Sequence, residues 1–173
     1  MIDLDTISTK PPENISKSEG KNSLIKLRKE LFELQNKFYA DGRFGLLIIL
    51  QGMDTSGKDG TIRYSLSSMN PQGVQVKSFK KPTEEELKHD FLWRVYPHIP
   101  PKGMIQVFNR SYYEDLLMPM VGKLLPEEVL AHRCKLIKYL EQHLRQNNIH
   151  VLKFFLHISK EEQGERIKER LTK

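Results

Sequence analysis

The chain has 173 residues, of which 38% are hydrophobic and 29% are charged, and its formal net charge is +6. This composition excludes disorder of the whole chain, and the longest apolar run falls far short of the roughly 18 to 20 residues that a membrane span needs. A positive balance favours an acidic partner such as a nucleotide, polyphosphate or nucleic acid, although an ordinary basic surface would give the same balance.

The N-terminal segment and the single cysteine bear on the location of the protein. Residues 1–20 are polar and contain no apolar signal core, so we expect no export signal. Cys134 cannot form an internal disulfide and is compatible with a reducing compartment. We therefore expect a cytoplasmic protein that does not associate with membranes.

The elements follow one another in a regular order along the chain. Residues 1–21 are rich in Ser, Lys, Pro and Glu, including Pro11-Pro12, and we expect a mobile N-terminal arm there. Leucines and other apolar residues at helical spacing predict a helix over 22–40, and the apolar run 44–50 suits a buried strand. The further predicted elements are a helix from Lys58, a strand over 74–79, a helix over 83–96, a strand over 103–108, helices over 113–120 and 126–146, a strand over 149–158 and a helix opened by Ser159.

Strands that alternate with helices predict an α/β fold, a three-layer sandwich with a central parallel sheet covered on both faces. The chain stops at Lys173, a few turns into the last predicted helix, with no cap or stop signal. Four strands would leave one edge of the sheet open. We therefore expect a piece of a longer protein, incomplete at its C-terminal end.

A glycine-rich segment directly follows the first predicted strand. Gly52-Met53-Asp54-Thr55-Ser56-Gly57-Lys58 matches the pattern G-x-x-x-x-G-K of a phosphate-binding P-loop, with a strand before it and a helix after it. Glycines let backbone N–H groups turn toward a phosphate, and the lysine supplies a positive charge. The alternative is a glycine-rich turn with an incidental lysine. Predicted phosphate-binding residues in this segment are Gly52, Thr55, Ser56, Gly57, Lys58, Asp59, Gly60 and Thr61.

Two carboxylates depart from the usual P-loop pattern. Asp59 stands where a Ser or Thr normally follows the lysine, and Asp54 lies inside the loop. A carboxylate beside bound phosphates would repel them unless a cation intervenes, and Mg²⁺ prefers both kinds of oxygen. We expect Mg²⁺ as the cofactor, held by Asp54, Asp59 and Glu114. The alternatives are that Asp54 caps backbone N–H groups and that Asp59 is an ordinary first-turn carboxylate.

A second polar group follows the third predicted strand. Asn109 and Arg110 come directly after it, at the carboxyl edge where ligands bind in parallel sheets. Asn109 is a candidate phosphate-binding residue without charge, and Arg110 can make bidentate contacts to phosphate. Glu114 lies one helical turn beyond Arg110 and could replace the carboxylate that P-loop enzymes commonly carry here, or simply form a surface ion pair with it.

Basic side chains elsewhere could line a groove for a long polyanion. Each could equally be a solvated surface charge. The candidates are Lys80, Lys81, Arg94, Lys102, Lys123 and Arg133.

The two motifs, 52–61 and Phe108-Asn109-Arg110-Ser111-Tyr112-Tyr113-Glu114-Asp115, resemble those of the polyphosphate kinase 2 family, over about residues 22–173. The resemblance implies a P-loop kinase fold and Mg²⁺-dependent transfer of a phosphoryl group between inorganic polyphosphate and nucleoside mono- or diphosphates, such as AMP and ADP. It implies catalytic roles for Asp54, Lys58, Arg110 and Arg170. It also implies a homo-oligomer in the full-length form, and a basic lid beyond Lys173, so that we expect this piece alone to be poorly active.

Two other functions remain open from the residues alone. An ATP-dependent nucleoside or nucleotide kinase would share the fold and the P-loop. A non-catalytic basic module that binds nucleotides or nucleic acid would share the charge. No aromatic-and-basic recognition motif is present, so we expect no nucleic-acid partner.

Overall fold

A computed structural model describes residues 3–10 and 14–172. Its centre is a parallel four-stranded sheet with the order β2-β3-β1-β4. The strands are β1 (Gly45–Gly52), β2 (Val74–Ser78), β3 (Ile105–Asn109) and β4 (Ile149–Leu156). All four predicted strands are therefore present, with ends that differ by a few residues from the prediction.

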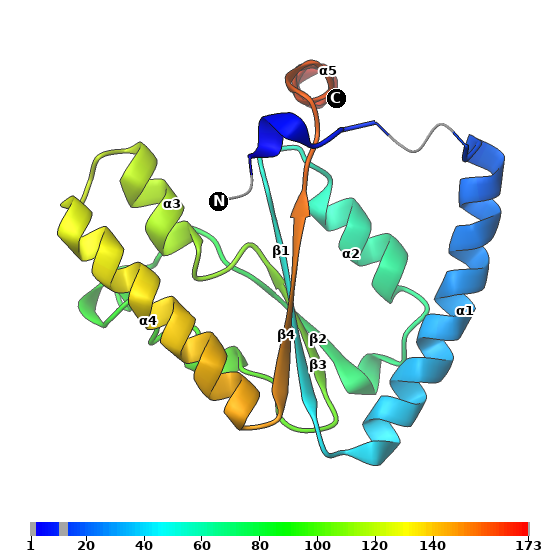
Figure 1. The fold of residues 1–173 in the computed structure, drawn as a ribbon, viewed down its shortest axis with the longest axis horizontal. Helices are drawn as coiled ribbons and strands as arrows, with labels where there is room; N and C mark the ends of the chain where they lie inside the picture. Colours follow the sequence, from blue (N-terminus) through cyan, green and yellow to red (C-terminus); the bar gives the residue numbers. More distant parts are fainter. Residues whose placement is uncertain (1–2, 11–13, 173) are drawn as a thin grey trace.

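Helices cover both faces of the sheet, which confirms the predicted three-layer α/β fold (Figure 1). On one face lie α1 (Lys17–Asp41) and α2 (Lys58–Leu66), and on the other lie α3 (Glu114–Val121) and α4 (Glu127–Gln146). The last helix, α5 (Lys160–Leu171), lies beyond the carboxyl end of β4 (Figure 1). None of the helices in the described ranges is both long and apolar enough to cross a membrane.

The apolar run in β1 explains why this strand is central. Leu47 and Ile49 alternate with Leu46 and Ile48, so each face of β1 carries apolar side chains. The core consists of two apolar clusters, one on each face of the sheet. Leu47 and Ile49 belong to the larger cluster, beneath α4, and Leu46 and Ile48 pack against the smaller cluster, beneath α1 and α2. Burial on both faces fixes the strand between two layers of helices and places its carboxyl end, the start of the glycine loop, at one edge of the sheet.

The first helix begins earlier than predicted. It starts at Lys17 because Ser16 and Glu19 form a reciprocal capping box, in which the Ser16 side chain accepts from the Glu19 N–H and the Glu19 carboxylate accepts from the Ser16 N–H. Part of the predicted arm is thus helical, and a short 3₁₀ turn, η1 (Leu4–Thr6), precedes it. The predicted mobility of Pro11-Pro12 lies outside the described residues.

The predicted helix over 83–96 is wrong. Thr83 and Glu86 cap each other, but only the 3₁₀ turns η3 (Glu86–Lys88) and η4 (Tyr96–His98) form. The Asp90 side chain accepts a hydrogen bond from the Leu92 N–H, which offers the backbone a turn in place of a helix.

The open edge that the sequence predicted is present. β4 pairs only with β1 within the described sheet. Leu152 and Phe154 of this strand are 46% and 49% exposed. They project on the face opposite Ile149 and Val151, which pack into the larger core. This edge strand therefore exposes both backbone hydrogen-bonding groups and apolar side chains.

Candidate active site

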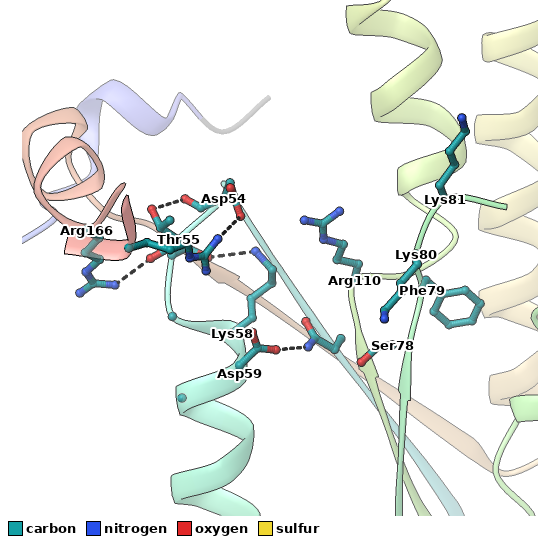
Figure 2. A pocket seen from close by; sticks show the side chains of 15 residues that line it. Asp54, Thr55, Lys58, Asp59, Ser78, Phe79, Lys80, Lys81, Arg110 and Arg166 are labelled. Carbon is teal, nitrogen blue, oxygen red and sulfur yellow. Dashed lines mark hydrogen bonds and ion pairs between the residues drawn. The ribbon is translucent and has the colours of Figure 1, made fainter. Parts of the chain in front are cut away.

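A cavity of about 490 Å³ opens at the carboxyl ends of β1, β2 and β3. The P-loop and the start of α2 form one side, and the segments that follow β2 and β3 form the other (Figure 2). The lining residues are Asp54, Thr55, Ser56, Gly57, Lys58, Asp59, Gly60, Ser78, Phe79, Lys80, Lys81, Asn109, Arg110, Arg166 and Arg170. Parallel strand order brings these distant segments to one edge.

The P-loop lysine lies inside the loop that it follows. Lys58 Nζ donates to the carbonyl oxygens of Met53, at 2.8 Å, and Gly52, at 2.9 Å, and lies 3.2 Å from Ser56 Oγ. Burial, and then the nearby charge of Arg110, lower the pKa of Lys58 below its usual value. The ammonium group is therefore held at the loop that leads directly into α2, and the first-turn N–H groups of such a helix attract an anion.

Two glycines permit this geometry. Gly57, at φ +96°, lies just before α2 in a conformation that other residues rarely adopt. At Gly52 a Cβ atom would lie 2.7 Å from Ser56 Oγ and 2.9 Å from the Leu156 carbonyl oxygen. No side chain fits between the loop and β4 at that point, so the loop packs closely against the sheet.

Two residues without the freedom of glycine have left-handed backbone conformations in the cavity. Thr55 has φ +60° and Arg110 has φ +62°. Such conformations cost about 1 to 3 kcal/mol each and persist where surrounding contacts enforce them. The Arg110 N–H donates to the Leu50 carbonyl oxygen at 3.0 Å, which ties this residue to the end of β1. The strain occurs at the two segments that sequence reasoning singled out.

The three predicted metal ligands do not form one cluster. Asp59 accepts a hydrogen bond from Asn109, and Glu114 accepts one from Gln51 at 2.6 Å. Asp54 lies 3.7 Å from Arg170. Glu114 thus pairs with Gln51, and the alternative ion pair between Glu114 and Arg110 does not form. Across residues 3–10 and 14–172, no group of three His, Cys, Asp or Glu side chains could hold a metal.

This arrangement still fits Mg²⁺. That ion is usually held by one or two carboxylates together with substrate phosphates and water, and rarely by a cage of protein ligands. Asp54 and Asp59 both line the cavity and offer carboxylate oxygens, whereas Glu114 does not line it. Asp54 and Asp59 therefore have the donor chemistry that a phosphate-bound Mg²⁺ requires.

Helix α5 contacts the P-loop through three side chains, two of which sequence reasoning missed. Gln163 donates to the Asp54 carbonyl oxygen at 3.0 Å, and Arg166 donates to the Thr55 carbonyl oxygen at 3.1 Å. Arg170, which was predicted, reaches the Asp54 carboxylate. Positions 163, 166 and 170 share one helix face, a spacing that could have revealed them if the orientation of α5 had been known.

The predicted polyanion groove is only partly formed. Lys80 and Lys81 line the cavity, whereas four other candidates do not. Arg133 donates to the Asp115 carbonyl oxygen. Lys102 precedes β3 at the opposite edge of the sheet, and Lys123 lies in the turn after α3.

Arg94, another candidate for the groove, is not available to a polyanion there, because its side chain is buried and forms ion pairs with Glu86 and Asp115. Gly52 and Thr61, which were predicted to bind phosphate, do not line the cavity. Phe79 and Ser78 line it and were not predicted. The pairing of Ser78 with Asn109, and the hydrogen bond from the Phe79 N–H to the Asn109 carbonyl oxygen, place both residues beside the end of β3.

The central parallel sheet, the strand–glycine loop–helix unit and the lysine held in that loop define a P-loop protein with a kinase-like three-layer fold. A model of the family described as Polyphosphate kinase 2 matches residues 14–173. The chain therefore belongs to the polyphosphate kinase 2 family, which confirms the resemblance seen in its motifs.

Curated relatives and solved structures agree with this assignment. The chain is 46% identical, over 92% of its length, to an AMP/ADP-polyphosphate phosphotransferase of Meiothermus ruber, and 43% identical, over 98%, to an ADP-polyphosphate phosphotransferase of Rhodopseudomonas palustris. The crystal structure of polyphosphate kinase 2 from Arthrobacter aurescens superposes with a TM-score of 0.95 at 39% identity, over 99% of this chain. The chain spans 62% or 63% of the length of these three proteins.

Proposed function

We propose that this chain carries the phosphate-binding and catalytic centre of a Mg²⁺-dependent polyphosphate:nucleotide phosphotransferase. One observation carries the proposal: the P-loop lysine lines a cavity whose lining residues include six cations and only two carboxylates. Such a site suits a ligand with many negative charges, and inorganic polyphosphate is such a ligand. The cationic residues are Lys58, Lys80, Lys81, Arg110, Arg166 and Arg170.

Phosphoryl transfer depends mainly on positioning and on stabilisation of charge, so each side chain receives a role of that kind. The N–H groups at the start of α2 and Lys58 would bind the phosphates next to the reacting bond. Arg110 and Arg170, from opposite sides of the cavity, would stabilise charge on the transferring group. Asp54 and Asp59 would hold Mg²⁺, which when bound neutralises charge between donor and acceptor phosphates.

The acceptors in this proposal are nucleoside mono- and diphosphates. The names of the two relatives support this class, because one specifies AMP and ADP and the other specifies ADP. Assembly into a homo-oligomer and a cytoplasmic location are further parts of the proposal.

A donor test on the full-length protein examines the proposal directly. Polyphosphate and ADP or AMP are supplied with Mg²⁺, or without it as a control, and without ATP, and new nucleoside tri- or diphosphate is measured together with equilibrium binding of polyphosphate. Lys58→Ala and Arg110→Ala should each lower turnover by about 10² to 10³ without loss of the fold. Lys168→Ala, on the exposed surface of α5, is the matched control.

The outcomes separate the proposal from its rivals. Phosphorylation that requires ATP as donor would indicate a nucleoside or nucleotide kinase. Salt-dependent binding of DNA or RNA without turnover would indicate a binding module. Polyphosphate binding that Lys58→Ala leaves unchanged would refute the role of the P-loop.

A further inference from the structure

Arg94 connects two walls of the cavity without reaching into it. Its side chain is only 6% exposed. One end of the guanidinium, Nη1, donates to the Lys80 carbonyl oxygen at 2.9 Å, and the other end, Nη2, donates to Asp115 Oδ2 at 2.8 Å. Nη1 also lies 3.7 Å from a Glu86 carboxylate oxygen. One buried group thus joins the segment after β2 to the first turn of α3.

Both of the joined segments carry cavity residues. Lys80 and the preceding Phe79 line the cavity on one side. The Phe79 ring packs edge-on against Phe108, with centroids 4.8 Å apart, and Arg94 lies over its face at 5.4 Å. Asp115 follows the strained Arg110 by five residues, within the short turn that opens α3. A shift of the Arg94 side chain would therefore move Lys80 relative to Arg110.

We propose that Arg94 is a positioning residue that sets the separation of Lys80 and Arg110 across the cavity, and so the fit of a polyphosphate chain between them. The inference rests on the proposed function, because polyphosphate is the ligand whose fit is at stake. Arg94 touches no substrate in this proposal and acts through the Lys80 segment.

The chemistry of the guanidinium suits this role. A planar fork can hold two acceptors at a fixed spacing, which a lysine ammonium cannot do on its flexible stem. The cost of burial is only partly offset, since Arg94 Nε is buried without a hydrogen-bond partner among the described residues. Desolvation raises the pKa of Asp115 while Arg94 opposes that rise, so the carboxylate depends on this partner. The buried pair of Arg94 and Asp115 therefore contributes more to the relative position of the two segments than to the stability of the fold.

The test is a double-mutant cycle in polyphosphate binding. Arg94→Lys keeps the charge and removes the fork, and Lys80→Ala removes the side chain through which Arg94 acts. Each single variant should weaken binding by about tenfold, and the double variant should also lose about tenfold, because the two residues act as one unit. Arg28→Lys is the matched control: Arg28 of α1 also has a buried Nε that no side chain or backbone group in the described part of the chain bonds, and its Nη2 donates to Ser67, just after α2 and away from the cavity.

Hydrogen exchange supplies a readout that does not depend on the ligand. Arg94→Lys should speed amide exchange over residues 79–88 and leave β1 and β4 unchanged, while Arg28→Lys should leave 79–88 unchanged. Additive losses of binding, near a hundredfold in the double variant, would overturn the inference alone, as would unchanged exchange over 79–88. A wild-type chain that binds no polyphosphate would overturn the proposed function, and the positioning role with it.

Discussion

Replacement of Gly52 by alanine tests whether the glycine at the start of the P-loop is required by packing. The added Cβ would lie 2.7 Å from Ser56 Oγ and 2.9 Å from the Leu156 carbonyl oxygen. The Ser56 side chain can rotate, but its hydroxyl lies 3.2 Å from Lys58 Nζ, so rotation disturbs the lysine. The Leu156 oxygen belongs to the backbone of β4, which is paired with β1 at this point, and it cannot move without opening the ladder.

The expected loss of stability combines two contributions. Gly52 has φ +157°, and an alanine held in such a sparsely populated conformation costs about 1 to 3 kcal/mol. Overpacking against a fixed backbone atom adds about 1 to 3 kcal/mol. A total near 3 kcal/mol would lower the Tm of a chain of this size by about 10 °C.

Thermal and urea unfolding, followed by circular dichroism, measure this loss. The matched control is Gly164→Ala, because Gly164 lies within α5 and a Cβ there would meet no atom within 4 Å. Alanine should stabilise that helix by about 0.5 to 1 kcal/mol. A Gly52→Ala protein as stable as the wild type would refute the account of the loop as closely packed against β4.

Three further predictions concern the alkaline stability, the P-loop ion pair and the sheet edge. Burial is the main cause that raises the pKa of Tyr112, and the nearby Glu141 carboxylate adds to it. Above about pH 10 the unfolded chain therefore loses the tyrosine proton while the folded chain keeps it. The free energy of unfolding then falls by up to about 1.4 kcal/mol per pH unit. Urea unfolding between pH 9 and 11 should therefore show the advantage of the wild type over Tyr112→Phe shrinking as the pH rises. The ion pair of Arg170 with Asp54 joins side chains that are 64% and 62% exposed, so Arg170→Ala should change the free energy of unfolding by less than about 1 kcal/mol while it lowers phosphoryl transfer, as unfolding and turnover assays would show. Because β4 exposes apolar side chains at an open edge, we expect the chain to self-associate through this strand, and Leu152→Lys should reduce that association in light scattering.

Each of these predictions has an outcome that contradicts it. A constant difference between wild type and Tyr112→Phe from pH 9 to 11 would show that the tyrosine proton is not linked to folding. Full turnover in Arg170→Ala would remove Arg170 from the catalytic group. Equal light scattering with and without Leu152→Lys would place the association surface elsewhere.

Local sequence patterns were sufficient for the strands and for the P-loop. A strand that is buried on both faces, such as β1, is a continuous apolar run, so the sequence predicts it without knowledge of which helices pack on it. The segment from Gly52 to Lys58 depends on glycines and a lysine at fixed spacing, so its geometry is largely set within seven residues. The same holds for the Ser159 cap of α5.

Patterns within one segment were insufficient where contacts with residues distant in the chain determine the conformation of a segment or the burial of a side chain. The 83–96 segment begins with a good helix cap, yet Asp90 turns the chain and Arg94 is drawn toward Lys80 and Asp115. From sequence, Arg94 was one more basic candidate for the groove, because nothing local distinguishes a buried arginine from an exposed one.

The sequence by itself therefore determined the fold class, the P-loop and the family, since these depend on periodicity and on short motifs. Only the tertiary structure decided which charges share the cavity: it brought Gln163 and Arg166 of α5 to the P-loop, placed Arg94 beneath the wall, and left Lys102 at the opposite edge. The physical reason is that charge acts through distance in space, and the order of strands in the sheet, more than their order in the chain, sets that distance.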